Sequence, residues 1–375
     1  MPLGFLRRRR PPPTHLVVDE PSGPLAIEGG TVLVRGWALA GDTDAGDVEV
    51  TAGGQPLRVR RHPRPDVAAA HPGVDQNLLV GFTAVGDRRD LPSDGEISVR
   101  AEFSGGQARI SDSVDFTNSF GEPVPTQPVD RCPVCSANER EVLGSSDGLR
   151  MARCGECTVV YTVDQPEAGF ARARYSETYF TDEYLPALEA EAEQMAGHWT
   201  LLLDMLEPHR GEASRLFEIG AGAGQFLDVA RARGWHVAGL DINAAAVAHG
   251  RSRYDLELIE APADGAIEPG GSYDAVVSEM SLEHVPDPAA VMAGAAEAVR
   301  PGGVVMVFTV CPDGDSFSSL GMAAPMVGPA EHLFLFSAAS LERLAHDAGL
   351  EPLHQWTDDA GDAVGLIARR PSQPA

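Results

Sequence analysis

The chain has 375 residues, of which 43% are hydrophobic and 22% charged, and its formal net charge is -26 at pH 7. This length predicts two or three domains, and no apolar run reaches the roughly 18 residues of a membrane span. Every basic residue is an arginine, and the acidic excess disfavours broad nucleic-acid binding, which requires basic patches. The basic tail at residues 1–13 lacks the apolar stretch of a secretory signal, so we expect a cytoplasmic protein.

Residues 14–120 have the alternating pattern of an all-β domain. The segments VEVTAGGQPLRVR and EISVRAEFSGGQARISDSVDF each predict two strands joined by a glycine pair, which supplies the positive φ values of a tight hairpin. One predicted face of the second segment is formed by alternate residues: Ile97, Val99, Ala101 and Phe103. The pattern predicts a β-sandwich. The motifs VRGWALAGD and RPDVAAAHPGV resemble Ig-like modules of bacterial surface-glycan proteins, which implies a glycan or partner contact, or a spacer without a ligand.

Four cysteines follow a Pro-rich linker at residues 121–130. They form two CxxC pairs: Cys132 with Cys135, and Cys154 with Cys157. Two such pairs bring four thiolates around one tetrahedral Zn²⁺, so we predict a zinc ribbon at residues 131–162. Because four protein ligands leave no open position, we expect a structural ion. The alternatives are two disulfides, which require an oxidising compartment, and a redox-active pair.

Strands and helices alternate in the domain predicted at residues 195–375, after a helical connector at residues 163–194. A helical pattern runs from Glu189 to His209. The strands predicted after it are Leu216–Ile219, His236–Leu240, Leu256–Ile259, Asp274–Ser278 and Val304–Val310. The helices predicted between and after them are Gln225–Arg233, Ala244–Arg253, Pro288–Val299 and Ala338–Ala348. This alternation predicts an α/β doubly wound, Rossmann-like sheet that binds its ligand at the carboxyl ends of the strands.

A glycine-rich turn follows the first of these strands, within RLFEIGAGAGQFLDVARARGWHVAGLDIN. The glycines stand at alternate positions: Gly220, Gly222 and Gly224. The dinucleotide fingerprint G-x-G-x-x-G would instead require a glycine at Gln225. Asp241 ends the second strand, where a carboxylate accepts the ribose hydroxyls of NAD or of S-adenosylmethionine (SAM). Glu218 would oppose a pyrophosphate but favours the ammonium and sulfonium of SAM, so the residues favour SAM.

The motif FEIGAGAG resembles the first motif of class I SAM-dependent methyltransferases, and LDIN resembles their acidic ribose-binding strand end. The segments EAVRPGGVVMVFTV and EHLFLFSAASLERLAHDAGL resemble later motifs of the branch with LEHV. The resemblance covers about residues 195–370 and implies SAM as the cofactor. The cofactor-binding residues expected are Glu218, Gly220, Ala221, Gly222, Gly224, Asp241, Ile242, Asp264 and Glu279. The chain departs from this branch where a Thr-Pro-Asn turn is usual, which affects the substrate side of the pocket.

Methyl transfer to a hydroxyl requires a base near the mouth of the sheet. Glu279, Glu283 and His284 follow the fourth predicted strand, which leads to that edge. We expect His284 to be the base, because its unperturbed pKa suits neutral pH, with Glu283 and His332 as further catalytic candidates. The alternatives are that the LEHV segment only fixes its loop and that His332 packs beside the neighbouring phenylalanines.

The acceptor is indicated only by resemblance. A ribbon joined to a methyltransferase domain resembles enzymes that modify sugars of surface polysaccharides or glycosylated metabolites, which implies O-methylation of a sugar or glycan. One alternative is methylation of a quinone, lipid or other small metabolite; tRNA is disfavoured by the acidity of the chain. A second alternative is a non-catalytic adaptor, against which the intact glycine turn and its carboxylates count.

Overall fold

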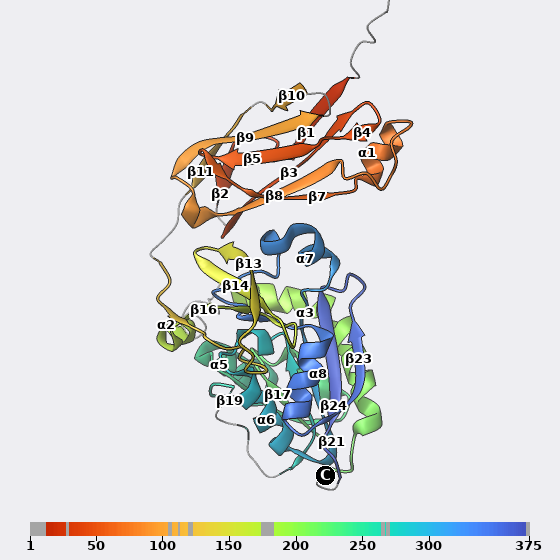
Figure 1. The fold of residues 1–375 in the computed structure, drawn as a ribbon. Helices are drawn as coiled ribbons and strands as arrows, with labels where there is room; N and C mark the ends of the chain where they lie inside the picture. The colour runs from red at the N-terminus through yellow and green to blue at the C-terminus, as the bar shows by residue number, and fades with distance from the viewer. Residues whose placement is uncertain are drawn as a thin grey trace, which may run out of the picture. The chain divides into compact units, whose positions relative to one another are not determined.

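The computed structural model describes residues 13–27, 30–103, 107–111, 113–118, 123–173, 184–263, 267 and 271–372. These residues form two compact units, one mainly before residue 119 and the other mainly after residue 122 (Figure 1). Each unit has its own hydrophobic core. None of the helices in the described ranges is long and apolar enough to cross a membrane.

The N-terminal unit contains two sheets and the short helix α1 (Pro65–Ala70). The first sheet has the order β1-β3-β8-β7 with β4 beside β3: β1 (Thr14–Glu20), β3 (Thr31–Ala40), β8 (Gly81–Asp87), β7 (Arg58–His62) and β4 (Thr43–Asp44). The second has the order β2-β11-β9-β5-β6 with β10 beside β9: β2 (Leu25–Ile27), β11 (Val114–Asn118), β9 (Asp94–Phe103), β5 (Asp47–Ala52), β6 (Gln55–Pro56) and β10 (Gln107–Ile110). Strands β2 and β11 pair in parallel.

A single hydrophobic cluster is shared by these two sheets. Val34 and Phe82 contribute to it from the first sheet, and Val50 and Val99 contribute from the second. Alternate residues of β9 are buried, as the period of two in its sequence predicts. The arrangement has the layering that a β-sandwich requires, whereas the Ig-like identity of the module stays a prediction.

The predicted glycine hairpins have different outcomes. Gly53 and Gly54 connect β5 to β6 with φ values of +56° and +80°, which only glycine adopts readily at both positions of such a turn. The second predicted pair, Gly105 and Gly106, lies outside the described residues.

A four-stranded sheet carries the cysteines. Its order is β13-β14-β15-β22: β13 (Arg140–Ser146), β14 (Leu149–Cys154), β15 (Val160–Thr162) and β22 (Phe334–Leu335). Strands β13, β14 and β15 follow one another in the chain, whereas β22 comes much later, from within the α/β segment. It pairs antiparallel with β15, with Leu335 opposite Val160. Beside this sheet, β12 (Thr126–Pro128) pairs with β16 (Asp164–Pro166), and α2 (Ala168–Ala173) follows.

A seven-stranded sheet forms the centre of the C-terminal unit. Its order is β19-β18-β17-β20-β21-β24-β23: β19 (Glu257–Glu260), β18 (His236–Asp241), β17 (Arg215–Ile219), β20 (Tyr273–Glu279), β21 (Val299–Val310), β24 (Ala363–Arg369) and β23 (Glu351–Thr357). The first five strands are parallel, and β24 is antiparallel to both of its neighbours. The chain therefore reverses its winding direction between β17 and β20, where such sheets bind ligands.

Helices cover both faces of this sheet. They are α3 (Tyr184–Leu206), α4 (Gln225–Ala232), α5 (Ala244–Tyr254), α6 (Pro288–Ala298) and α8 (Ala338–Asp347); the short helix α7 (Asp315–Leu320) follows β21 in the chain. Leu216 of β17 shares one cluster with residues of α3 and α4. The next residue, Phe217, faces the opposite cluster with residues of α6, α8 and the cysteine-bearing sheet. This alternation produces a three-layer α/β unit.

The predicted doubly wound, Rossmann-like fold is confirmed for this unit. The five predicted strands and four predicted helices are present, with ends that differ by a few residues. Gly234 and Gly349 have positive φ values just after α4 and α8, which is typical of glycines at helix C-termini. Strands β22, β23 and β24 were not predicted. The proposed domain boundaries stay predictions.

Candidate functional site

The glycine turn lies between β17 and α4, at the carboxyl edge of the parallel strands. Gly220, Gly222 and Gly224 all have positive φ, at +73°, +53° and +85°. A Cβ atom on Gly220 would lie 2.4 Å from the Cβ of Ser281, and one on Gly224 would lie 2.4 Å from Leu256. Both the backbone conformation and the lack of space therefore require glycine. Ala221, the remaining predicted residue of the turn, is buried, and its N–H donates to the carbonyl of Leu240.

Asp241 ends β18 beside this turn. Its Oδ2 accepts from the N–H of Gly222 and its Oδ1 from the N–H of Asn243, each at 2.8 Å. Burial raises the pKa of the carboxyl group, and these backbone hydrogen bonds act in the opposite direction. Because each carboxylate oxygen has a second lone pair, the fixed group can still accept two ligand hydroxyls. The predicted neighbour, Ile242, is partly exposed at the same edge.

Two glutamates, Glu218 and Glu279, add further carboxyl groups to this edge of the sheet. Glu218 of β17 is 3% exposed, and its Oε2 has no hydrogen-bond partner among the described residues. Burial, followed by the charges of Glu279 and Asp241, raises its pKa well above the ordinary value. An unpaired carboxylate among other acids is costly to bury, so this site is electrostatically suited to a bound cation.

Helix α3 holds the third carboxylate, Glu279, at the end of β20. The indole Nε1 of Trp199 donates to Oε2 at 3.1 Å. His198 Nε2 lies 3.2 Å from Oε1 of Glu279, and the His198 ring packs on Phe308. Neither of these α3 residues was predicted from the sequence. His198 and Trp199 are adjacent within the helical pattern, and the periodicity of that pattern does not indicate their contact with Glu279.

Asp264, another of the expected cofactor-binding residues, lies outside the described residues.

The candidate bases lie together beyond β20 and before β22. His284 and Glu283 belong to a short 3₁₀ helix at Leu282–His284. The rings of His284 and His332 have centroids 4.8 Å apart. The buried Glu283 accepts from Thr309 Oγ1 at 2.8 Å. Its Oε1 lies 3.9 Å from His284 Nε2 and has no hydrogen-bond partner in the part of the chain that the structure describes. One ligand atom from each of the three side chains lies within 4.8 Å of the others, a set that could also hold a metal ion.

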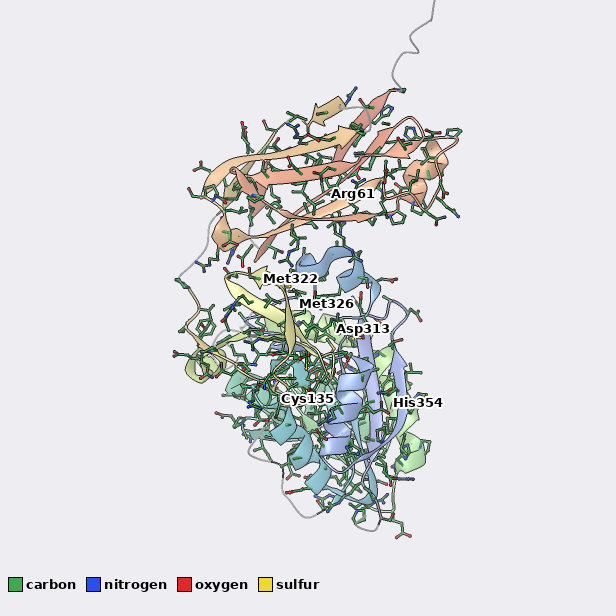
Figure 2. All side chains as sticks on the ribbon, viewed as in Figure 1. Arg61, Cys135, Asp313, Met322, Met326 and His354 are labelled. Carbon is green, nitrogen blue, oxygen red and sulfur yellow. The ribbon has the colours of Figure 1, made fainter. Side chains whose placement is uncertain are left out.

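Backbone carbonyls fix the tautomers of both histidines. His284 Nδ1 donates to the carbonyl of Glu331 at 3.0 Å, and His332 Nδ1 donates to that of Met326 at 2.7 Å (Met326 is labelled in Figure 2). A carbonyl only accepts, so a neutral ring has its proton on Nδ1 and its lone pair on Nε2. Burial lowers the pKa of His284, which keeps that ring neutral and able to accept a proton at pH 7.

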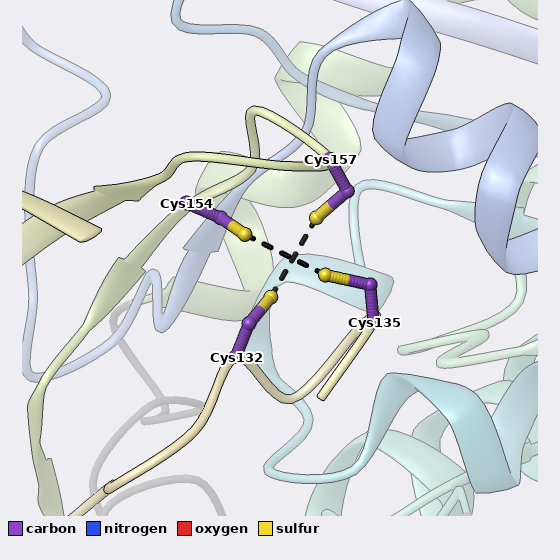
Figure 3. Close-up of side chains that lie close together, drawn as sticks. All are labelled: Cys132, Cys135, Cys154 and Cys157. Carbon is purple, nitrogen blue, oxygen red and sulfur yellow. Dashed lines mark hydrogen bonds between the residues drawn. The ribbon is translucent and has the colours of Figure 1, made fainter. Parts of the chain in front are cut away.

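The four cysteines converge at one end of the cysteine-bearing sheet, with their sulfur atoms pointing toward one another (Figure 3). The Sγ atoms of Cys132 and Cys157 are 3.6 Å apart, and those of Cys135 and Cys154 are 3.5 Å apart. All four lie within 4.8 Å of one another as free thiols. A hydrogen bond from Cys157 lowers the pKa of Cys132 to about 5, while burial raises that of Cys135 to about 11.

Comparisons with known proteins identify the family. A family model described as a methyltransferase domain matches residues 191–355. A protein of Thiobacillus denitrificans, named ubiquinone biosynthesis O-methyltransferase, is 31% identical over 150 residues, which are 36% of this chain and 64% of that protein. A protein of Aromatoleum aromaticum with the same name is 30% identical over 164 residues, which are 40% of this chain and 70% of that protein. The chain belongs to the SAM-dependent methyltransferases.

The methyltransferase spans less than two thirds of the first relative's length. Among solved structures, the geranyl diphosphate C-methyltransferase of Streptomyces coelicolor, in complex with Mg²⁺, geranyl diphosphate and S-adenosyl-L-homocysteine (SAH), is 19% identical. That match has a TM-score of 0.38 and covers 46% of this chain and 77% of the other.

The expectation of a sugar or glycan acceptor is wrong. Both relatives of the methyltransferase are named for O-methylation in ubiquinone biosynthesis, which agrees with the alternative of a quinone or other small metabolite. The sugar expectation came from the ribbon and the N-terminal module, and both lie outside the matched residues 191–355. A role in polysaccharide biosynthesis and a glycan contact through the N-terminal unit lose their support with it.

Proposed function

We propose that the protein transfers a methyl group from SAM to a hydroxyl of a small quinone-like or phenolic metabolite. The observation that carries this proposal is the combination of two histidines with basic Nε2 atoms and a carboxylate-lined glycine turn at one edge of the sheet. The relatives' names support the acceptor class. An O-methyltransferase adds its methyl group to an oxygen atom and produces a methoxy group. The acceptor of such an enzyme in quinone biosynthesis therefore carries a hydroxyl at that position.

The carboxylates and glycines form the cofactor half of the site. Asp241 accepts hydrogen bonds from the ribose hydroxyls, since its orientation is fixed by two backbone N–H groups. Glu218 and Glu279 compensate the positive ammonium and sulfonium groups of SAM. When bound, SAM supplies a methyl group activated by its sulfonium. The buried, unpartnered Oε2 of Glu218 supports this fit, because a nearby cation would relieve its unfavourable burial.

The histidines form the acceptor half. His284 Nε2 would accept the proton of the acceptor hydroxyl, and bound SAM would supply the methyl group to that oxygen and leave as SAH. His332 is the second base, and Glu283 stabilises the resulting imidazolium from a buried position beside it. A protonated His284 would lower the pKa of Asp241, so the base lies near the cofactor half. Such a positioned base contributes on the order of 100- to 10,000-fold to the rate.

The four cysteines are proposed to hold a structural Zn²⁺ in a zinc ribbon at residues 131–162. A tetrahedral ion with Zn–S bonds of about 2.3 Å has sulfur–sulfur edges of about 3.8 Å, close to the 3.5 and 3.6 Å found for two pairs. Four thiolates leave no position for a reacting water, so the ion has no catalytic role. Reduced cysteines also fit the cytoplasmic location proposed from the sequence.

The test uses purified protein, trideuteromethyl SAM and single acceptors, with mass spectrometry of the products. The acceptors are 3,4-dihydroxybenzoate, hydroquinone and, as a carbohydrate control, methyl glucoside. A trideuteromethyl ether on either aromatic acceptor, together with SAH, supports the proposal. Labelled methyl glucoside without labelled aromatic acceptors would contradict it, as would transfer to carbon.

A further inference from the structure

We propose that Thr162 of the cysteine-bearing sheet is a positioning residue for the two active-site histidines, so that the predicted zinc ribbon forms part of the active-site framework. The inference rests on the proposed catalytic role of His284 and His332. Thr162 is distant from both histidines in the sequence, and no sequence motif assigns it a function.

The strand that follows His332 pairs with the cysteine-bearing sheet. Strand β22 starts two residues later, at Phe334, and it pairs with β15 of the cysteine-bearing sheet rather than with the central sheet. Val160 lies opposite Leu335 and Tyr161 opposite Phe334. The backbone that follows His332 is therefore aligned by the cysteine-bearing sheet.

Thr162 extends this pairing to the histidine segment itself. Its N–H donates to the carbonyl of Leu333 at 2.8 Å, and its Oγ1 donates to the carbonyl of Pro329 at 3.1 Å. The side chain is fully buried. A single residue thus holds both ends of the five-residue segment Pro329–Leu333.

Both histidines depend on that segment. Its middle contains Glu331, whose carbonyl accepts from His284 Nδ1, and His332 itself. The N–H groups of Glu331 and His332 both donate to the carbonyl of Gly328, which makes the segment a tight turn. A displacement of the turn would move the acceptor that orients one imidazole and the backbone that carries the other.

The cysteines are connected to the same framework through the core. Cys132, Cys154 and Cys157 share a hydrophobic cluster with Leu333, Phe334 and Phe336 and with residues of α6 and α8. Thr158, next to Cys157, has its Oγ1 2.7 Å from the Oγ of Ser337, the residue that caps α8. Loss of the ion would free the ends of β14 and β15 and, through Thr162, the turn.

The test compares Thr162→Val with Thr162→Ser. Valine keeps the shape and burial but leaves the Pro329 carbonyl without its donor, whereas serine keeps the hydroxyl. A matched control, Arg153→Gln, removes a different contact of the cysteine-bearing sheet, the 3.2 Å pair of Arg153 with Asp313 (Asp313 is labelled in Figure 2). SAH affinity is measured by calorimetry and kcat and KM with 3,4-dihydroxybenzoate. Selective histidine Cε1–H NMR signals are assigned with His284→Gln and His332→Gln.

We expect Thr162→Val to reduce kcat at least about tenfold, to leave SAH affinity within twofold, and to shift the NMR signals of both histidines. Thr162→Ser restores kcat and the signals, and Arg153→Gln changes neither. Unchanged histidine signals in Thr162→Val would overturn the inference, as would equal losses in the serine variant. Zinc-depleted protein, verified by metal analysis, is expected to show the same signal shifts, and unshifted signals there would overturn the role of the ribbon.

The NMR outcome separates this inference from the catalytic proposal. If His284→Ala and His332→Ala retain full turnover, the proposed role of the histidines fails. The signals of the two rings in Thr162→Val still report whether Thr162 positions them, because that measurement does not depend on turnover.

Discussion

Substitution of Glu218 by glutamine is expected to stabilise the ligand-free protein and to weaken its cofactor site. The carboxyl group is 3% exposed with an unpartnered oxygen, and burial together with Glu279 and Asp241 raises its pKa well above the ordinary value. A buried acid with a raised pKa binds its proton more tightly in the folded than in the unfolded protein. Its stability contribution is therefore complete below the unfolded pKa of about 4.3 and is lost as the pH rises toward the folded value.

Glutamine has the same shape and no such pH dependence. At pH 7 we expect Glu218→Gln to raise the free energy of unfolding by about 1 kcal/mol or more, because glutamine removes the titration cost of the buried carboxyl, which is about 1.4 kcal/mol for each unit by which the folded pKa exceeds the unfolded one, up to pH 7. The gain is expected to disappear near pH 4. In the complex, loss of one charge-assisted contact with the ligand ammonium, about 1.5–3 kcal/mol, is expected to weaken SAH binding by about 10- to 150-fold.

The assay combines thermal unfolding of ligand-free protein at pH 7 and pH 4.5 with calorimetry of SAH binding at pH 7. A matched control is Glu257→Gln, which removes an exposed glutamate from the neighbouring part of the same sheet and is expected to change the free energy of unfolding by less than about 0.5 kcal/mol. Unchanged SAH affinity, or a less stable ligand-free Glu218→Gln protein at pH 7, would refute the reasoning.

Three further predictions follow from the acceptor half and the cysteines. His284→Ala is expected to leave SAH affinity unchanged and to reduce turnover by about 100-fold or more; steady-state kinetics showing normal turnover would eliminate it as the base. Because burial lowers the pKa of His284 and only the neutral ring accepts a proton, the acidic limb of the pH–rate profile should have its midpoint below the ordinary value of about 6.5, and a midpoint above it would contradict this. Cys135→Ser is expected to lose bound zinc in metal analysis and to lower the thermal stability of the protein. Cys311→Ser changes a cysteine that is remote from the cluster in sequence and should retain the zinc. Equal zinc content in both variants would exclude the metal site.

The sequence predicts the central sheet well because its signals are local. Each βα unit has an apolar run, a turn residue and an amphipathic helix, and Gly220 and Gly224 are required by backbone conformation and contact distance at one turn. Such constraints act over a few residues, so a single sequence is sufficient to recognise them.

The contacts that complete the site are long-range and were not predicted. Trp199 reaches Glu279 from a helix that precedes the sheet, and Thr162 reaches Leu333 from the cysteine-bearing sheet. Neither residue belongs to a motif, because each acts through a hydrogen bond whose partner is far away in the chain. Strand β22 has only two residues, so its pairing leaves no periodic pattern to detect.

The acceptor was mispredicted for a related reason. The shared methyltransferase motifs at Glu218 and Asp241 describe cofactor binding, which is common to enzymes with different acceptors. The proposed acceptor side depends on the segment that carries His284 and on the turn before β22, where side chains from separate elements meet. The sugar expectation relied instead on modules outside this site.

The measurement that tests the account most directly is the destination of the methyl group. Purified protein would be incubated with methyl-labelled SAM and an extract of the source cells, followed by separation of carbohydrates, RNA, lipids and small aromatic metabolites. The account predicts label as a methyl ether in the quinone and phenolic fraction, with an equal amount of SAH, and loss of that label in His284→Ala. Label confined to the carbohydrate fraction, or no transfer by protein that binds SAH, would contradict it.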